Sequence, residues 1–194
     1  MPIEIRGLGV LTDEEWERLS PDADAHRLLS SDSGSGELWM GETPEMEDFR
    51  FVPQELRGMP SGFYTPERFD VRIDLYGSCA KAADGVDEFV YALWDSHING
   101  WDAEAFGILG DAVAETVFWL DVGKRVVVNC QAGLNRSGLV SALALMEWAG
   151  LTADEAINLI HARRSPLCLV NASFVAFLKE KGQTFLDELF RGNE

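Results

Sequence analysis

Cysteine, basic residues and long apolar runs are all scarce in this chain of 194 residues. Its three cysteines are an odd number without regular spacing, which argues against a disulfide-stabilised secreted domain and favours a reducing, cytoplasmic setting. We find no segment that resembles a signal peptide and no apolar run as long as a membrane span, so we expect no membrane association. Internal repeats and low-complexity runs are also missing, which favours one globular domain.

The 16 basic residues are outnumbered by 33 acidic ones, and the formal net charge is −17. A surface of this sign repels the phosphates of nucleic acids and of anionic membranes, so we expect neither as a partner. The charge does not prevent a small basic pocket from forming inside a negative shell.

The most informative segment is residues 124–138, with the sequence KRVVVNCQAGLNRSG. Three consecutive valines, 126–128, indicate a strand that is buried on both faces, as in a parallel sheet. Residues 139–148 are almost continuously apolar and are soon followed by a glycine, which is typical of a buried helix. Cys130 is therefore predicted at the carboxyl end of a strand and Arg136 at the amino end of a helix, the edge where α/β sheets bind ligands.

A loop between these two elements can hold an anion. Residues 131–136 can point several backbone N–H groups inward, and Gly133 tolerates the backbone angles that such a turn requires. The start of the helix adds free N–H groups, and Arg136 adds a planar, permanently charged fork that binds two phosphate oxygens. Because a positive field favours thiolate over thiol, Cys130 would be a nucleophile aimed at phosphorus.

The segment Cys130-Gln-Ala-Gly-Leu-Asn-Arg136-Ser137 resembles the signature of the cysteine-dependent phosphatases, the protein tyrosine and dual specificity phosphatase superfamily. That signature is a cysteine, five residues and an arginine, followed by serine or threonine. The resemblance covers residues 70–180 better than residues 1–65, which we expect to be an extension packed on a single phosphatase-like domain, residues 1–194. It implies an α/β fold with a mostly parallel central sheet and helices on both faces.

The resemblance also implies roles for individual residues. Cys130 would attack phosphorus, Arg136 would stabilise the transferred phosphoryl group, and the Ser137 hydroxyl would help the sulfur to leave in the second step. Asn129 stands where the family usually has histidine; it can support the loop by hydrogen bonds but brings no imidazolium charge. No metal or cofactor is expected, because Arg136 and the backbone supply the positive charge. The phosphate-binding loop would consist of Gln131, Ala132, Gly133, Leu134, Asn135 and Arg136.

The leaving oxygen needs a proton donor, which the family supplies from an aspartate thirty-odd residues before the cysteine. Asp95 lies 35 residues before Cys130 and ends a predicted strand, whereas Asp102 lies 28 residues before it and begins a predicted helix. We favour Asp95, because the carboxyl end of a strand faces the same crevice as the loop. Asp102 is the alternative, although a helix N-cap is its more common role, and His97 is a lesser candidate in the same loop.

The sequence therefore predicts a phosphatase of the dual specificity type, acting on phosphotyrosine, phosphoserine or phosphothreonine in a protein or on a small phosphorylated substrate. Asn129 leaves open a catalytically weak phosphate-binding protein, a pseudophosphatase. The Gly-Leu-Asn-Arg stretch leaves open an RNA or nucleotide 5′-phosphatase, which the net charge disfavours. A thiol-based reductase also uses a Cys-x5-Arg loop, but the context of Ser137 fits it less well.

Periodicity and capping signals predict the remaining elements. We expect an edge strand within residues 1–11, a short helix that starts with a capping box at Thr12, and an irregular segment over residues 42–66. The other expected elements are strands at 37–41, 69–76 and 87–94, and helices at 103–120, 152–163 and 171–189.

Overall fold

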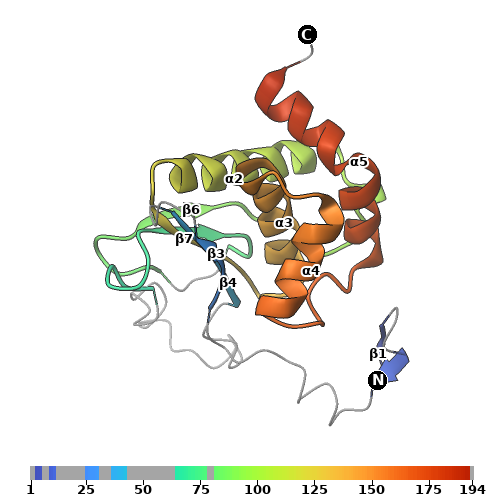
Figure 1. The fold of residues 1–194 in the computed structure, drawn as a ribbon, viewed down its shortest axis with the longest axis horizontal. Helices are drawn as coiled ribbons and strands as arrows, with labels where there is room; N and C mark the ends of the chain where they lie inside the picture. Colours follow the sequence, from blue (N-terminus) through green and yellow to red (C-terminus); the bar gives the residue numbers. More distant parts are fainter. Residues whose placement is uncertain are drawn as a thin grey trace.

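The computed structural model describes residues 3–5, 9–11, 25–30, 36–42, 64–77 and 81–192 (Figure 1). Two sheets are present in this part of the chain, a two-stranded hairpin and a five-stranded sheet with the strand order β3-β4-β7-β5-β6. The strands are β1 (Ile3–Ile5), β2 (Gly9–Leu11), β3 (His26–Ser30), β4 (Glu37–Glu42), β5 (Val71–Asp74), β6 (Asp87–Val90) and β7 (Arg125–Cys130). The helices are η2 (Ile98–Gly100), α2 (Ala103–Asp121), α3 (Arg136–Ala149), α4 (Ala153–Arg163) and α5 (Ala172–Arg191).

The five-stranded sheet is mostly parallel, as predicted. Strand β7 occupies its centre and pairs in parallel with both β4 and β5, and β6 continues this direction at one edge. Only β3, at the other edge, is antiparallel to its neighbour. The strand that leads to Cys130 is therefore hydrogen-bonded on both sides, which holds its carboxyl end firmly in place.

The three valines of β7 are all fully buried because each face of the sheet is covered. Val126 and Val128 belong to the large core cluster together with the inner sides of α2, α3, α4 and α5. Val127 points to the opposite face, where it joins a smaller cluster with Tyr64 and Phe69. The four described α-helices thus pack on one face of the sheet, and helices on the second face stay a prediction.

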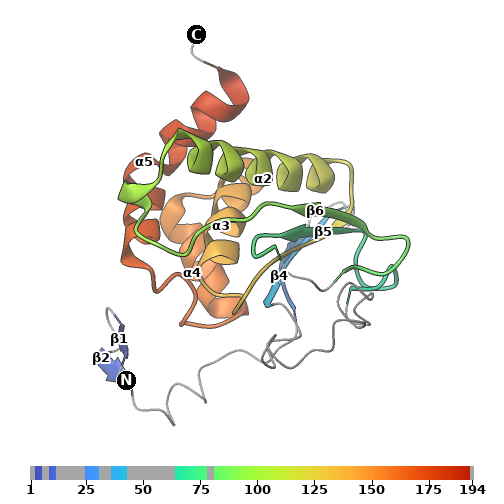
Figure 2. The ribbon, with the colours of Figure 1, turned by 180° about the vertical axis from the view of Figure 1, so that it is seen from behind.

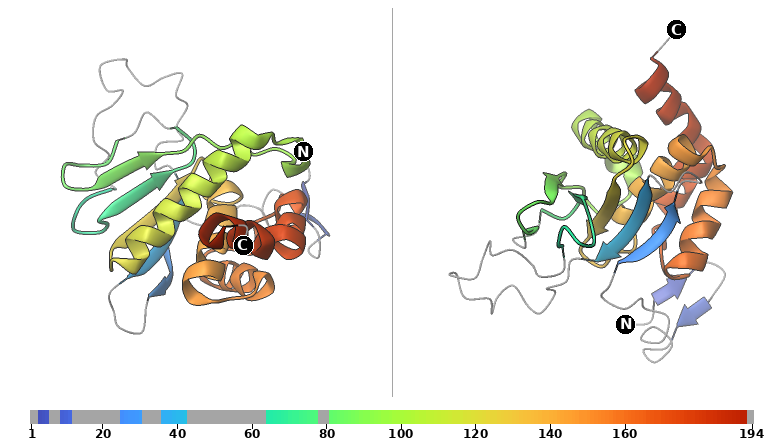
Figure 3. Two further views of the ribbon diagram at one scale, coloured as in Figure 1. Left: turned by 90° about the horizontal axis from the view of Figure 1, so that it is seen from above. Right: turned by 60° about the vertical axis from the view of Figure 1, so that its left-hand side comes forward.

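Helix α3 lies in the middle of the helical layer, between α2 and α4 (Figure 2). The two views in Figure 3 show α2 on one side of this layer and α4 with α5 on the other. This placement explains the almost continuously apolar sequence of α3, since neighbours surround it and residues 136–146 are all buried.

The capping signals predicted for α2, α3 and α4 are confirmed. Asp102 is the N-cap of α2 and accepts a hydrogen bond from the backbone N–H of Ala105, and Thr152 with Glu155 forms a complete capping box at α4. Gly150 follows α3 in the left-handed conformation that ends many helices. The polar loop that precedes α2 differs from the expectation in containing the short helix η2.

The amino-terminal third departs most from the sequence-based expectations. A β1–β2 hairpin replaces the single edge strand expected there, and β3 was not predicted. Since β3 and β4 are strands of the central sheet, the described part of residues 1–65 is more than an extension packed on the domain. The helix expected from Thr12 and nearly all of the irregular segment 42–66 lie outside the described residues.

Candidate active site

The loop of residues 131–135 connects the end of β7 to the start of α3, as the sequence predicts. Gly133 has a φ of 60°, a left-handed conformation that side chains disfavour, so the turn requires glycine here. Asn135 is the N-cap of α3, but its side chain makes no capping hydrogen bond. Because no cap side chain occupies them, the first N–H groups of α3 can bind an anion.

Cys130 and Ser137 meet at the base of this loop. The Cys130 Sγ atom lies 3.2 Å from the Ser137 Oγ atom, and both side chains are buried. A serine hydroxyl at this distance can donate a hydrogen bond to the sulfur. The geometry therefore supports the predicted assistance of Ser137 to a departing thiolate.

Two backbone carbonyl groups fix the position of the Arg136 guanidinium. Its Nη1 atom donates to the carbonyl oxygens of Leu93, at 3.2 Å, and Leu75, at 3.4 Å. The Tyr76 ring lies against the guanidinium, with 5.2 Å between the Arg136 Cζ atom and the ring centroid. The loop side chain of Gln131 offers its Oε1 atom to Nη2 at 3.5 Å, which is a weak contact.

The Arg136 guanidinium is buried and has no carboxylate partner among the residues that the structure describes. The residue is only 7% exposed, and within the described part of the chain its Nε atom has no hydrogen-bond partner and no acidic side chain forms an ion pair with it. A buried, unneutralised charge is unfavourable unless an anion joins it. The arrangement is that of a binding site for an oxyanion.

The back of the loop is fixed by the segment that follows α4. Arg164 donates from Nε to the Gly133 carbonyl at 2.7 Å and from Nη1 to the Met40 carbonyl at 3.3 Å. The backbone N–H of Leu169 donates to the Leu134 carbonyl at 3.1 Å. These contacts turn loop carbonyls outward, so that loop N–H groups are left to face a ligand.

Asp95 is the acid candidate that the structure brings to the loop. Its two carboxylate oxygens accept hydrogen bonds from the side-chain amides of Asn135, at 3.1 Å, and Asn171, at 3.2 Å. Asp102 instead caps α2, where its carboxylate accepts from the Ala105 N–H at 2.9 Å. His97 is exposed at the start of η2 and makes no capping contact.

Asn129 is buried beneath the loop and bonded on both sides. Its Oδ1 atom accepts from Arg72 Nε at 2.9 Å, and its Nδ2 atom donates to Asp74 Oδ1 at 3.3 Å. We did not anticipate Arg72 and Asp74 from the sequence. The available signal was two charged residues at alternate positions of a strand that is covered on both faces, which indicates a buried ion pair.

Cys168, the second cysteine in the described part of the chain, is not expected to act as a nucleophile. Cys168 is buried near the loop, with its Sγ atom 4.0 Å from the Gly133 carbonyl oxygen. Burial raises the pKa of the Cys168 thiol to about 12, although Arg164 opposes this shift. Cys168 therefore remains a neutral thiol at physiological pH and does not compete as a nucleophile.

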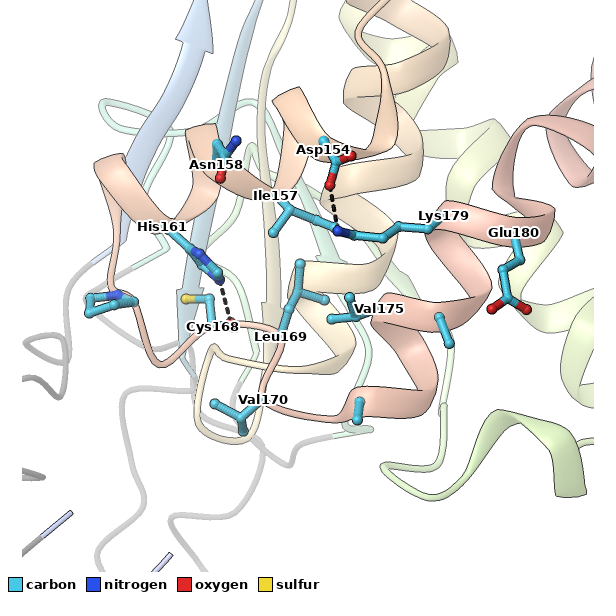
Figure 4. Close-up of a pocket in the computed structure, with 13 residues that line it drawn as sticks. Asp154, Ile157, Asn158, His161, Cys168, Leu169, Val170, Val175, Lys179 and Glu180 are labelled. Atoms are coloured by element: carbon cyan, nitrogen blue, oxygen red, sulfur yellow. Dashed lines mark hydrogen bonds and ion pairs between the residues drawn. The ribbon is translucent and has the colours of Figure 1, made fainter. Parts of the chain in front are cut away.

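A separate cavity of about 550 Å³ lies between α4 and α5 (Figure 4). The Asp154–Lys179 ion pair spans it, and His161 Nε2 lies 2.9 Å from the Cys168 carbonyl oxygen on its wall. None of the site residues predicted from the sequence lines this cavity.

The described residues contain no group of three or more His, Cys, Asp or Glu side chains that could hold a metal ion. Over the same residues, no helix has both the length and the apolar character that crossing a membrane requires.

Part of the chain matches a known protein family. Residues 104–184 match the family model for the dual specificity phosphatase catalytic domain, and this match includes the whole loop from Cys130 to Ser137. The resemblance to the cysteine-dependent phosphatases is confirmed. Asp95 lies outside the segment that the family model matches.

Solved phosphatase structures share the fold over most of the chain. A mouse putative dual specificity phosphatase complexed with zinc tungstate is 19% identical, with a TM-score of 0.60, and the match covers 93% of this chain and 95% of that one. Human DUSP28 is 19% identical, with a TM-score of 0.58 and coverage of 87% and 99%. PTPMT1 is 19% identical, with a TM-score of 0.57 and coverage of 86% and 99%. No curated protein sequence matches the chain.

Proposed function

We propose that the protein is a phosphatase that hydrolyses phosphate monoesters through a cysteinyl-phosphate intermediate, of the dual specificity type. The observation that carries this proposal is the buried guanidinium of Arg136, which has no carboxylate partner in the described part of the chain and lies six residues after a cysteine at the same sheet edge. A phosphoryl dianion supplies the missing charge, and the free N–H groups of the loop and helix supply hydrogen bonds to its oxygens.

The reaction proceeds in two steps. The Cys130 thiolate attacks phosphorus while Arg136 and the loop N–H groups stabilise the equatorial oxygens, and the leaving oxygen takes a proton from Asp95. Water then attacks the phosphoenzyme and gives a proton to the Asp95 carboxylate, while Ser137 donates a hydrogen bond to the departing sulfur, 3.2 Å away in the resting site.

Replacing the nucleophile tests the proposal directly. Cys130→Ser should abolish turnover of p-nitrophenyl phosphate, while tungstate, the oxyanion in the mouse structure, still binds with measurable heat in calorimetry. Cys168→Ala is the matched control, because it removes a buried thiol of the same domain and should retain turnover. Equal turnover by wild type and Cys130→Ser would contradict the mechanism.

A pseudophosphatase is the second candidate, and Asn129 is the observation that favours it. Tungstate binding by pure wild-type protein without turnover of any aryl phosphate would establish this function instead.

The substrate class can be determined by comparing hydrolysis rates across a panel of phosphorylated substrates. PTPMT1, one of the similar structures, has been solved in complex with PI(5)P, so a phosphoinositide belongs beside phosphopeptides and RNA with a 5′-triphosphate end. The net charge of −17 disfavours RNA and anionic lipid surfaces, and we expect phosphopeptides to be hydrolysed fastest.

A further inference from the structure

Four polar side chains form a cluster on the sheet face opposite the helices: Arg72, Asp74, Glu88 and Asn129. The strand register creates it, since Arg72 pairs with Glu88 across β5 and β6 and Asp74 pairs with Asn129 across β5 and β7. Arg72, Asp74 and Asn129 are fully buried. Because Asn129 immediately precedes Cys130 in β7, the cluster adjoins the nucleophile.

Arg72 is the fixed point of this cluster. Its Nη1 atom bonds to Glu88 and its Nη2 atom lies 3.3 Å from Asp74 Oδ2. The guanidinium also stacks on Tyr64, with 4.1 Å between the Cζ atom and the ring centroid. Among the described residues, this buried arginine has two carboxylate partners and Arg136 has none, so the charge of Arg72 is neutralised within the fold.

Asp74 connects Asn129 to the turn at Leu75 and Tyr76, which contacts Arg136. Its Oδ1 atom accepts from Asn129 Nδ2, at 3.3 Å, and from the backbone N–H of Tyr76, at 2.9 Å. The second bond closes a local turn at the end of β5. This turn presents the Leu75 carbonyl to Arg136 Nη1 and the Tyr76 ring to the face of the guanidinium.

We propose that Asp74 is a positioning residue of the phosphatase site, acting on Cys130 through Asn129 and on Arg136 through the Leu75–Tyr76 turn. The Asp74 carboxylate is held by Arg72. It sets the distance between the Cys130 sulfur and the Arg136 guanidinium, which both contact the phosphoryl group. Asn129 is suited to this cluster because it accepts from Arg72 and donates to Asp74 at once. The inference deepens the proposed function and rests on it.

A double-mutant cycle tests the proposal. Asn129→Ala and Asp74→Asn should each lower kcat/KM for p-nitrophenyl phosphate and weaken tungstate inhibition about tenfold, the range for loss of a charge-assisted hydrogen bond. The double variant should lose little more than the worse single variant, because both changes break the same connection.

Asp70→Asn is the matched control. Asp70 lies just before β5 and pairs with Arg125 at the start of β7, so the substitution breaks an ion pair between the same strands at the end far from the loop. It should lower the melting temperature and leave kcat/KM and the tungstate inhibition constant within about twofold of wild type. A residue with only a structural role would behave in this way.

Two results would overturn the inference. One is an Asp74→Asn variant that shifts the melting temperature but matches Asp70→Asn in kcat/KM and tungstate inhibition; the other is a double variant whose losses are fully additive. If Asp74→Asn does not fold, Asn129→Ala decides alone, and unchanged tungstate affinity contradicts the proposal. If wild type has no turnover, the proposed function fails, whereas the tungstate dissociation constants of the same variants still test the positioning role.

Discussion

Arg136→Lys should cost far more activity than an exchange of one cation for another suggests. The guanidinium uses Nη1 for the Leu75 and Leu93 carbonyls and leaves Nε for the oxyanion. An ammonium is a single point charge, so it can bond to the carbonyls or to the phosphoryl oxygens but not to both sets in the required geometry. One charge-assisted bond and the alignment are lost, about 3 kcal/mol, which corresponds to roughly a hundredfold in kcat/KM.

The assay is steady-state hydrolysis of p-nitrophenyl phosphate, with tungstate inhibition measured in parallel. Arg163→Lys is the control, because Arg163 is exposed at the end of α4 and its exchange should leave both quantities within about twofold of wild type. A kcat/KM for Arg136→Lys within tenfold of wild type would refute the argument that the free Nε atom and the carbonyl anchors work together.

Three further predictions concern the acid, the loop support and the second thiol. Asp95→Asn should flatten the basic limb of the pH–rate profile and slow substrates with poor leaving groups most, whereas Asp102→Asn should change neither, since asparagine caps helices as well as aspartate does. Gly138→Ala places a Cβ atom 2.9 Å from the side chain of Leu169, in the segment that supports the loop. The substitution should therefore lower the free energy of unfolding in urea by about 1–3 kcal/mol. Gly107→Ala is the control and should not destabilise the protein, because nothing lies within 4 Å of the added Cβ atom. Iodoacetamide at pH 8 should leave Cys168 unmodified in peptide maps, because burial raises its thiol pKa to about 12; a modified Cys168 would contradict this.

The local elements around the site could be predicted because each is specified by its own sequence. The valines of β7, the glycine at position 133 and the apolar run of α3 fix strand, turn and helix without reference to the rest of the chain. The preference for Asp95 over Asp102 as the general acid could also be argued from the sequence, since Asp102 has the sequence context of a helix cap and Asp95 does not.

What the sequence did not reveal depends on pairing between distant segments. Strand β3 is stabilised by β4, and its sequence HRLLS shows no alternation that would mark it as an edge strand. The Asp74–Asn129 contact joins residues 55 positions apart and follows only from the β5–β7 register.

Replacing the buried arginines Arg72 and Arg136 should have different effects on the stability of the protein. Arg72→Met should lower the free energy of unfolding by about 3–5 kcal/mol, because Arg72 has two carboxylate partners in the described part of the chain, Asp74 and Glu88. Arg136 has none in the described part of the chain, so Arg136→Met removes an unneutralised charge and should leave that free energy unchanged or higher, while abolishing turnover. Urea unfolding at pH 7 measures both. Equal destabilisation by the two substitutions would mean that Arg136 is a structural arginine, and the oxyanion site would lose its main support.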